Sequence, residues 1–173
     1  SFGFLENLQL TAPLWLPAHG PAVVIGAGGA ARAVCAALID NGVPELRLVN
    51  RTSSRAEDVA EHIGGPIKVY PWQERAMALN DAALLVNATT MGMTGHPPLE
   101  LDLSRLPVKA IVNDIVYSPL VTPLLENANQ RGNPTVDGLG MLLHQARPGF
   151  AAWFGVEPKV SAGLRAHMLR GRD

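Results

Sequence analysis

The fold of this chain is decided by Val23-Val24-Ile25-Gly26-Ala27-Gly28-Gly29-Ala30-Ala31. An apolar, β-branched run ends in glycines and an alanine-rich segment follows at once, which predicts a strand, a tight turn and a helix. Gly26, Gly28 and Ala31 stand at the G-x-G-x-x-G/A positions of a dinucleotide-binding turn. There Gly26 permits the turn, Gly28 lets the backbone approach a pyrophosphate, and Ala31 keeps the helix close to the strand. The free N–H groups of the helix amino end would face the phosphates.

The end of the second expected strand indicates which dinucleotide binds. NAD-binding folds usually place an Asp or Glu there to accept a hydrogen bond from the ribose 2′-hydroxyl. Here Leu46-Arg47-Leu48-Val49 is followed by Asn50 and Arg51, with Arg55 one helical turn further on. Two guanidinium groups without a carboxylate suit a 2′-phosphate, so the sequence predicts NADP as the cofactor. The alternative is a tight loop with two arginines on a solvated surface.

Composition limits the classes of protein to consider. The chain has 173 residues, of which 47% are hydrophobic and 17% charged, as in a globular protein with a substantial core. Its 14 basic and 15 acidic residues give a formal net charge of −1, and a protein that binds nucleic acid usually needs a basic stripe instead. The charge balance therefore argues against nucleic acid as the main partner.

The single cysteine and the histidines carry little chemistry of their own. Cys35 cannot form a disulfide within the chain, and its spacing places it on the apolar face of a helix, so we interpret it as a small core residue. The five histidines show no metal-ligand spacing, and no metal is expected.

Pro13, Pro17 and Pro21 interrupt the first apolar region, and no signal peptide is evident. The expected location is cytoplasmic, away from membranes.

Strands and helices are expected to alternate along the chain, which predicts an α/β fold with a doubly wound, Rossmann-like parallel sheet of about six strands. The expected strands are 22–25, 45–49, 67–70, 83–86, 110–115 and 135–136. The expected helices are a short one at the start and then 30–40, 53–62, 122–131, 138–154 and 160–170. We divide the chain into a linking helix and Pro-rich linker (1–20), a dinucleotide-binding domain (21–137) and C-terminal helices (138–173).

Five motifs in this order resemble the nucleotide-binding half of shikimate dehydrogenase, an NADP-dependent oxidoreductase of aromatic amino-acid biosynthesis. They are the turn 26–30, the loop Asn50-Arg51-Thr52-Ser53-Ser54-Arg55, the loop 87–93, the segment 117–125 and the helix start 137–146. The match covers nearly the whole chain. Any one motif alone would be weak evidence, whereas five in register are specific.

The resemblance implies a role for each matching residue. The residues implied to bind the cofactor are Gly26, Ala27, Gly28, Gly29 and Ala30 at the pyrophosphate, Asn50, Arg51, Thr52 and Arg55 at the 2′-phosphate, Thr89 and Thr90 along the cofactor, and Ile115, Gly138 and Met141 at the nicotinamide end. Tyr117 and Gln145 are implied to reach the hydroxyl or carboxylate groups of shikimate. Without the resemblance, Tyr117 would be interpreted as a turn aromatic, Gln145 as a surface residue and Met141 as a packing residue.

The resemblance also implies what this chain does not contain. The family's catalytic Lys and Asp belong to an amino-terminal half, and Ser1-Phe2-Gly3-Phe4 looks like the residues just after that Asp. We therefore expect no catalytic residue in this chain, and interpret Asp114 and Asp137 as turn-stabilising. Two alternatives stay open: a relative that acts on quinate as well as shikimate, and a free-standing NADP-binding module without catalysis.

The apolar residues of the terminal helices are too many to be buried against one sheet. They are Phe2, Phe4, Leu5, Leu8, Leu142, Leu143, Phe150, Trp153, Phe154, Leu164, Met168 and Leu169. We expect part of this surface to be stranded, which favours association into a homo-oligomer through these helices. The alternative is a monomer in which the helices fold back onto their own domain.

Overall fold

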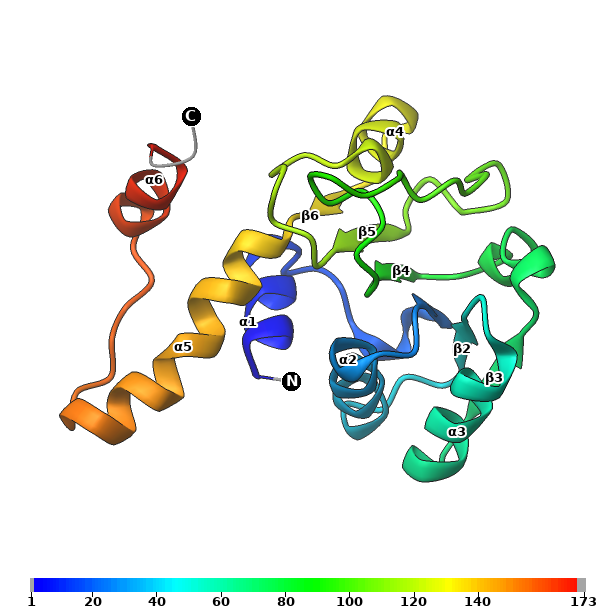
Figure 1. Ribbon diagram of the computed structural model, residues 1–173, viewed down its shortest axis with the longest axis horizontal. Coiled ribbons are helices and arrows are strands. Elements are labelled where there is room, and N and C mark those ends of the chain that lie inside the picture. The colour runs from blue at the N-terminus through cyan, green and yellow to red at the C-terminus, as the bar shows by residue number, and fades with distance from the viewer. Residues whose placement is uncertain (1, 171–173) are drawn as a thin grey trace.

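A computed structural model describes residues 2–170 and contains one parallel sheet of six strands in the order β3-β2-β1-β4-β5-β6 (Figure 1). The strands are β1 Ala22–Ile25, β2 Leu46–Val49, β3 Ile67–Tyr70, β4 Leu84–Asn87, β5 Ile111–Asp114 and β6 Thr135–Val136. The α-helices are α1 Phe2–Thr11, α2 Gly29–Asp40, α3 Ser53–Ile63, α4 Pro123–Arg131, α5 Gly138–Phe154 and α6 Ala162–Arg170. Short 3₁₀ turns lie at Pro17–His19, Trp72–Glu74 and Met77–Leu79. The predicted Rossmann-like fold is confirmed.

The central strands are buried on both sides, as their continuous apolar sequences predict. Every residue of β1, β2, β4 and β5 is buried. Ile25 lies opposite Val49 on one side and Asn87 on the other, and Asn87 lies opposite Asp114. The carboxyl ends of the four strands therefore form one continuous edge of the sheet, and the loops that leave it lie side by side.

Two hydrophobic clusters cover the two faces of the sheet. Side chains from α1, α2 and α3 pack on one face, among them Phe4, Val34 and Val59. Side chains from α4 and from the segments before β4 and β5 pack on the other face, among them Leu79 and Leu125. Cys35 is fully buried in the first cluster, and burial raises the pKa of its thiol to about 12, so that its interpretation as an unreactive core residue is confirmed.

The first helix packs closely against the fifth. A Cβ atom at Gly3 would lie 2.6 Å from the backbone N of Gln145, and one at Gly140 would lie 1.7 Å from Oδ1 of Asn7. Asn7 also donates a 2.7 Å hydrogen bond from Nδ2 to the backbone O of Asp137. Because neither glycine has a side chain, the two helices approach each other closely, and Figure 1 shows them side by side.

The stranded apolar surface expected at the chain ends is present on α5 and α6 but not on most of α1. Phe4 and Leu8 are buried, because the close approach of α1 to α5 covers them. The second half of α5 and α6 reach away from the sheet in Figure 1. The exposed aromatic and aliphatic side chains there are Phe150, Trp153, Phe154, Leu164 and Met168, and Trp153 is 83% exposed.

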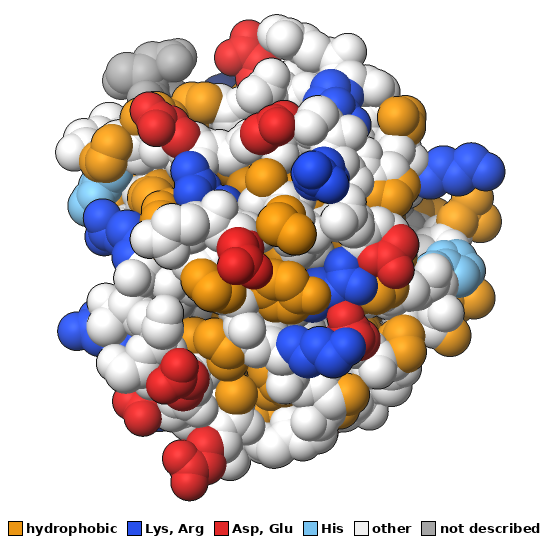
Figure 2. All heavy atoms as spheres, turned by 90° about the vertical axis from the view of Figure 1, so that its right-hand side faces the viewer, with side chains coloured by type: hydrophobic (Ala, Val, Ile, Leu, Met, Phe, Trp, Pro, Cys, Tyr) orange, Lys and Arg blue, Asp and Glu red, His pale blue; other side chains and the backbone are white. Residues whose placement is uncertain are grey.

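Charges of both signs are interspersed on the face drawn in Figure 2, with hydrophobic side chains between them. That face therefore carries no broad field of a single sign. Among residues 2–170, no helix combines the length and apolar character needed to cross a membrane. Within the same residues, no cluster of three His, Cys, Asp or Glu side chains could hold a metal ion.

Candidate functional site

The loop after β1 forms an open cradle at the amino end of α2. Gly26 has φ +118°, and a Cβ there would lie 2.9 Å from the carbonyl O of Ala88, so the tight turn depends on glycine. At Gly28 and Gly29 a Cβ would meet no described atom within 4 Å. Gly28 caps the helix without any side-chain hydrogen bond, so the N–H groups of the first turn remain available to an anion.

The loop after β2 places two arginines beside this cradle. The backbone N of Gly26 donates to the O of Val49 at 2.7 Å, which joins the two strand ends. Asn50 donates from Nδ2 to the O of Thr52 at 2.9 Å and so orders the loop. Arg51 and Arg55 are exposed, and neither forms an ion pair within the described part of the chain. The structure thus brings together the two halves of the predicted dinucleotide site.

Asn87, the last residue of β4, organises the third loop. Its Oδ1 accepts hydrogen bonds from the backbone N and Oγ1 of Thr89 at 3.1 and 2.7 Å. Its Nδ2 donates to the O of Met91 and to Oδ1 of Asp114, both at 3.0 Å. Thr89, half-buried, and Thr90, exposed, are therefore held at the edge of the sheet where the other loops lie.

Asp114, the last residue of β5, is a buried carboxyl group that ties the fourth loop to the third. Besides Asn87, it accepts from the backbone N of Val116 at 3.0 Å and from Oγ1 of Thr122 at 2.7 Å. Thr122 in turn caps α4 by accepting from the N of Leu125. Burial raises the pKa of Asp114, and the three hydrogen bonds oppose that rise. The predicted turn-stabilising role of Asp114 is confirmed.

The start of α5 meets the loop after β5 almost without space between them. A Cβ at Gly138 would lie 2.2 Å from the carbonyl O of Ile115 and 2.6 Å from that of Val116. Asp137 caps α5 by accepting from the N of Leu139 at 3.0 Å, which confirms its turn-stabilising role. Ile115 and Met141 pack, with Ala27 of the first loop, against the same hydrophobic cluster. Residues predicted for the two ends of the cofactor therefore contact one hydrophobic cluster.

The two residues predicted to contact substrate are exposed. Tyr117 is 40% exposed and follows β5, two residues after Ile115. Gln145 lies on α5, exposed, with its backbone N and Cβ against Gly3. Both stand on elements that begin at the carboxyl edge of the sheet, and their roles stay predictions.

The sequence did not identify two of the residues that organise this edge. Asn87 was assigned only to a loop, and Thr122 only to the start of a helix. A polar residue at the end of an otherwise apolar strand is the signal that would have identified Asn87, since a buried amide needs several hydrogen-bond partners.

Comparison with known proteins agrees with this arrangement. The family model described as shikimate / quinate 5-dehydrogenase matches residues 18–94. A shikimate dehydrogenase (NADP(+)) of Paramagnetospirillum magneticum is 63% identical over 169 residues, which is 98% of this chain and 61% of that protein. The protein of the same name from Rhodospirillum rubrum is 58% identical over 97% of this chain and 61% of its own length. This chain thus spans about 61% of the length of these relatives.

Solved structures share the fold over most of the chain. Quinate dehydrogenase from Corynebacterium glutamicum in complex with NAD has a TM-score of 0.88 and 33% identity, over 97% of this chain and 60% of that one. Shikimate 5-dehydrogenase from Thermus thermophilus in complex with NADP(H) and shikimate has a TM-score of 0.76 and 38% identity, over 91% and 56% respectively.

Proposed function

Because this chain belongs to the shikimate dehydrogenase family, we propose that residues 21–137 are the NADP-binding domain of an enzyme that reduces 3-dehydroshikimate to shikimate. The observation that carries the proposal is the open glycine cradle at the start of α2, with Arg51 and Arg55 on the adjoining loop, exposed and without an ion pair among residues 2–170. The relatives' name, shikimate dehydrogenase (NADP(+)), supports the same cofactor and substrate.

NADP(H) fits the residues that are present. The free first-turn N–H groups of α2 would bind the pyrophosphate, where Gly28 and Gly29 leave room for it. Arg51 and Arg55, with Asn50 and Thr52, would bind the 2′-phosphate, since a guanidinium matches the planar donor geometry that phosphate accepts.

Bound NADPH supplies a hydride, and this chain's residues would orient its nicotinamide end. The backbone of Ile115 and Gly138 would contact that end, and Met141 would keep water from the ring. Tyr117 and Gln145 would bind hydroxyl or carboxylate groups of the substrate from this side of the cleft. We assign no proton-transfer role to any residue of this chain.

Arg51→Ala is expected to weaken NADP binding by about tenfold or more, because one charge-assisted hydrogen bond contributes roughly 1.5–3 kcal/mol. NAD has no 2′-phosphate, so its affinity should stay nearly unchanged. Isothermal titration calorimetry with both dinucleotides measures the two effects. The preference of the unchanged chain for NADP should also shrink as salt is added.

Arg105→Ala is the matched control, because Arg105 is an exposed arginine in the segment before β5, at the opposite edge of the sheet. It should leave both affinities unchanged. Equal affinities of the unchanged chain for NAD and NADP would contradict the assignment of the 2′-phosphate site, as would an Arg51→Ala variant that binds NADP normally.

A second candidate is a quinate-using member of the same family. The description of the matching family model includes quinate, and the Corynebacterium neighbour is a quinate dehydrogenase with bound NAD. The two exposed arginines after β2 favour the NADP-dependent shikimate enzyme, since a bare ribose hydroxyl does not require them.

We further propose that another protein domain or a second chain covers the exposed apolar surface of α5 and α6. For this chain by itself, a second copy would bury Trp153 and Phe154 through the same helices, because exposed apolar patches favour association. Light scattering after size exclusion is expected to give a mass above that of one chain. A monomer at all concentrations would contradict self-association.

A further inference from the structure

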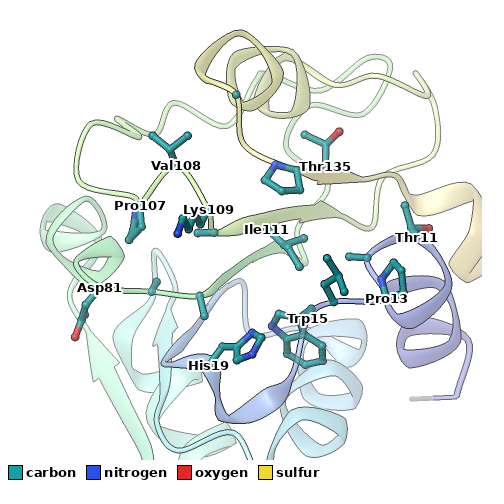
Figure 3. A pocket seen from close by; sticks show the side chains of 17 residues that line it. Thr11, Pro13, Trp15, His19, Asp81, Pro107, Val108, Lys109, Ile111 and Thr135 are labelled. Atoms are coloured by element: carbon teal, nitrogen blue, oxygen red, sulfur yellow. The ribbon is translucent and has the colours of Figure 1, made fainter.

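A second hollow lies at the opposite edge of the sheet, and nothing in the proposed function uses it. Figure 3 shows the side chains that line it, and its volume is about 860 Å³. It is lined by the end of α1 and the linker after it (11–15), by His19 and by residues at the starts of β4, β5 and β6 or just before them. Ala83, Ile111 and Thr135 mark these amino ends, whereas the cofactor loops leave the carboxyl ends. The hollow and the proposed cofactor site are therefore separate.

The wall of this hollow is mainly apolar. Trp15 is 7% exposed and lies beside His19 in Figure 3, with Ile111 nearby. At the margin Leu14 is 88% and Val108 is 54% exposed, although both are aliphatic. Hollows of roughly 300–1,000 Å³ with apolar walls and a few polar groups are typical of small-molecule sites. An aromatic ring suits a wall of this composition.

The polar groups of the hollow favour an anion. Asp81 points away from the hollow in Figure 3, and its carboxylate is paired with Arg47 at 2.9 Å. Lys109 forms no ion pair within residues 2–170. His19 accepts at Nδ1 from the backbone N of Leu16 at 3.3 Å, which leaves Nε2 as the hydrogen-bond donor of the ring. Among the residues that line the hollow, Lys109 thus supplies a cation without an ion-pair partner in the described part of the chain, His19 supplies a donor, and the carboxylate of Asp81 is paired with Arg47.

We propose that this hollow binds a small aromatic carboxylate, with the ring against Trp15 and Ile111 and the carboxylate on Lys109. A cation would meet Lys109 as a like charge, and a neutral ligand would gain no charge-assisted hydrogen bond from it. The site is separate from the cofactor edge, so both ligands bind at once.

Calorimetry and ¹H–¹⁵N NMR with 2-naphthoate test the proposal on this chain. We expect saturable binding that moves the Trp15 indole signal and the amide signals of 107–111, equally with and without saturating NADP. The uncharged analogue 2-naphthalenemethanol should bind more weakly. Lys109→Met should weaken naphthoate binding by about threefold to fivefold, as for a solvent-accessible ion pair, and leave the alcohol unaffected. Lys109→Arg, which keeps the positive charge, should bind naphthoate as the unchanged chain does.

Lys159→Met is the matched control, because Lys159 is also exposed but lies between α5 and α6. Four outcomes would overturn the proposal. The first is that naphthoate does not bind at millimolar concentration, and the second is that NADP displaces it. The third is that the Lys109→Met and Lys159→Met variants bind naphthoate equally well. The fourth is that the hollow is covered in concentrated samples and becomes accessible to naphthoate only when the protein is diluted. The last would mean that a second copy of the chain fills it.

Discussion

The purified 173-residue chain is expected to bind NADP and yet to oxidise shikimate no faster than a protein-free control. A positioned acid or base accelerates such proton transfers by roughly 10²–10⁴-fold, and orientation of the substrate adds more. The expected result depends on where the acidic residues and the lysines of the described chain lie.

The aspartates next to the proposed nicotinamide end are already engaged, and the lysines among residues 2–170 lie elsewhere. Asp114 is buried and accepts three hydrogen bonds, and Asp137 caps α5 and pairs with Arg165. Lys68 on β3 pairs with Glu45, while Lys109 precedes β5 and Lys159 follows α5. Asp114 and Asp137 adjoin Ile115 and Gly138 in the chain, but their oxygens are already engaged, so we expect neither to give a proton to a carbonyl oxygen there.

The assay follows NADPH absorbance with saturating shikimate and NADP, and calorimetry on the same sample establishes that the cofactor site is formed. Shikimate dehydrogenase from Thermus thermophilus serves as the positive control. Shikimate-dependent formation of NADPH by pure chain would show that a catalytic group had been overlooked within these residues.

Gly138→Ala is expected to destabilise the fold by at least about 3 kcal/mol, at the upper end of the range for overpacked sites. The new Cβ would lie 2.2 Å from the backbone O of Ile115, and backbone cannot move aside as the end of a flexible side chain can. Relief requires either the start of α5 or the loop after β5 to shift, and both belong to the proposed nicotinamide end. Urea unfolding followed by circular dichroism measures the loss.

Gly149→Ala is the control within the same helix, because a Cβ there would meet no described atom within 4 Å. Alanine has a higher helix propensity than glycine, so this variant should be unchanged or more stable by up to about 1 kcal/mol. A Gly138→Ala variant as stable as the unchanged chain would show that the junction has room that the structure does not contain.

Local sequence was sufficient to predict most of the fold. The strands 22–25, 67–70 and 135–136 were predicted with the observed bounds, because a short apolar run between glycine or proline turns specifies its own ends. The predicted strand 110–115 is shorter, Ile111–Asp114, since Ile115 already belongs to the loop. The adjacency of the loops 26–30 and 50–55 followed from the parallel order of the strands.

Features built from distant segments could not be predicted in this way. Asn87 ties its loop to the end of β5 through Asp114, 27 residues further on, and the apolar pattern of a single strand contains no trace of that bond. The burial of Phe4 depends on Gly3 meeting the backbone of α5. The hollow beside Trp15 is formed by several separate segments, each of which reads as an ordinary turn on its own.

The contact between α1 and α5 gives the chain a particular order of assembly during synthesis. Asn7 and Asp137 are 130 residues apart, so the ribosome makes α1 well before its partner. At about 5–20 residues per second, α1 waits on the order of ten seconds with Phe4 and Leu8 uncovered. The α2–α3 half of the sheet can collapse in that time, whereas α1 can dock only after the start of α5 has emerged. Although α1 precedes the other described elements in the chain, it is thus among the last of them to reach its native position.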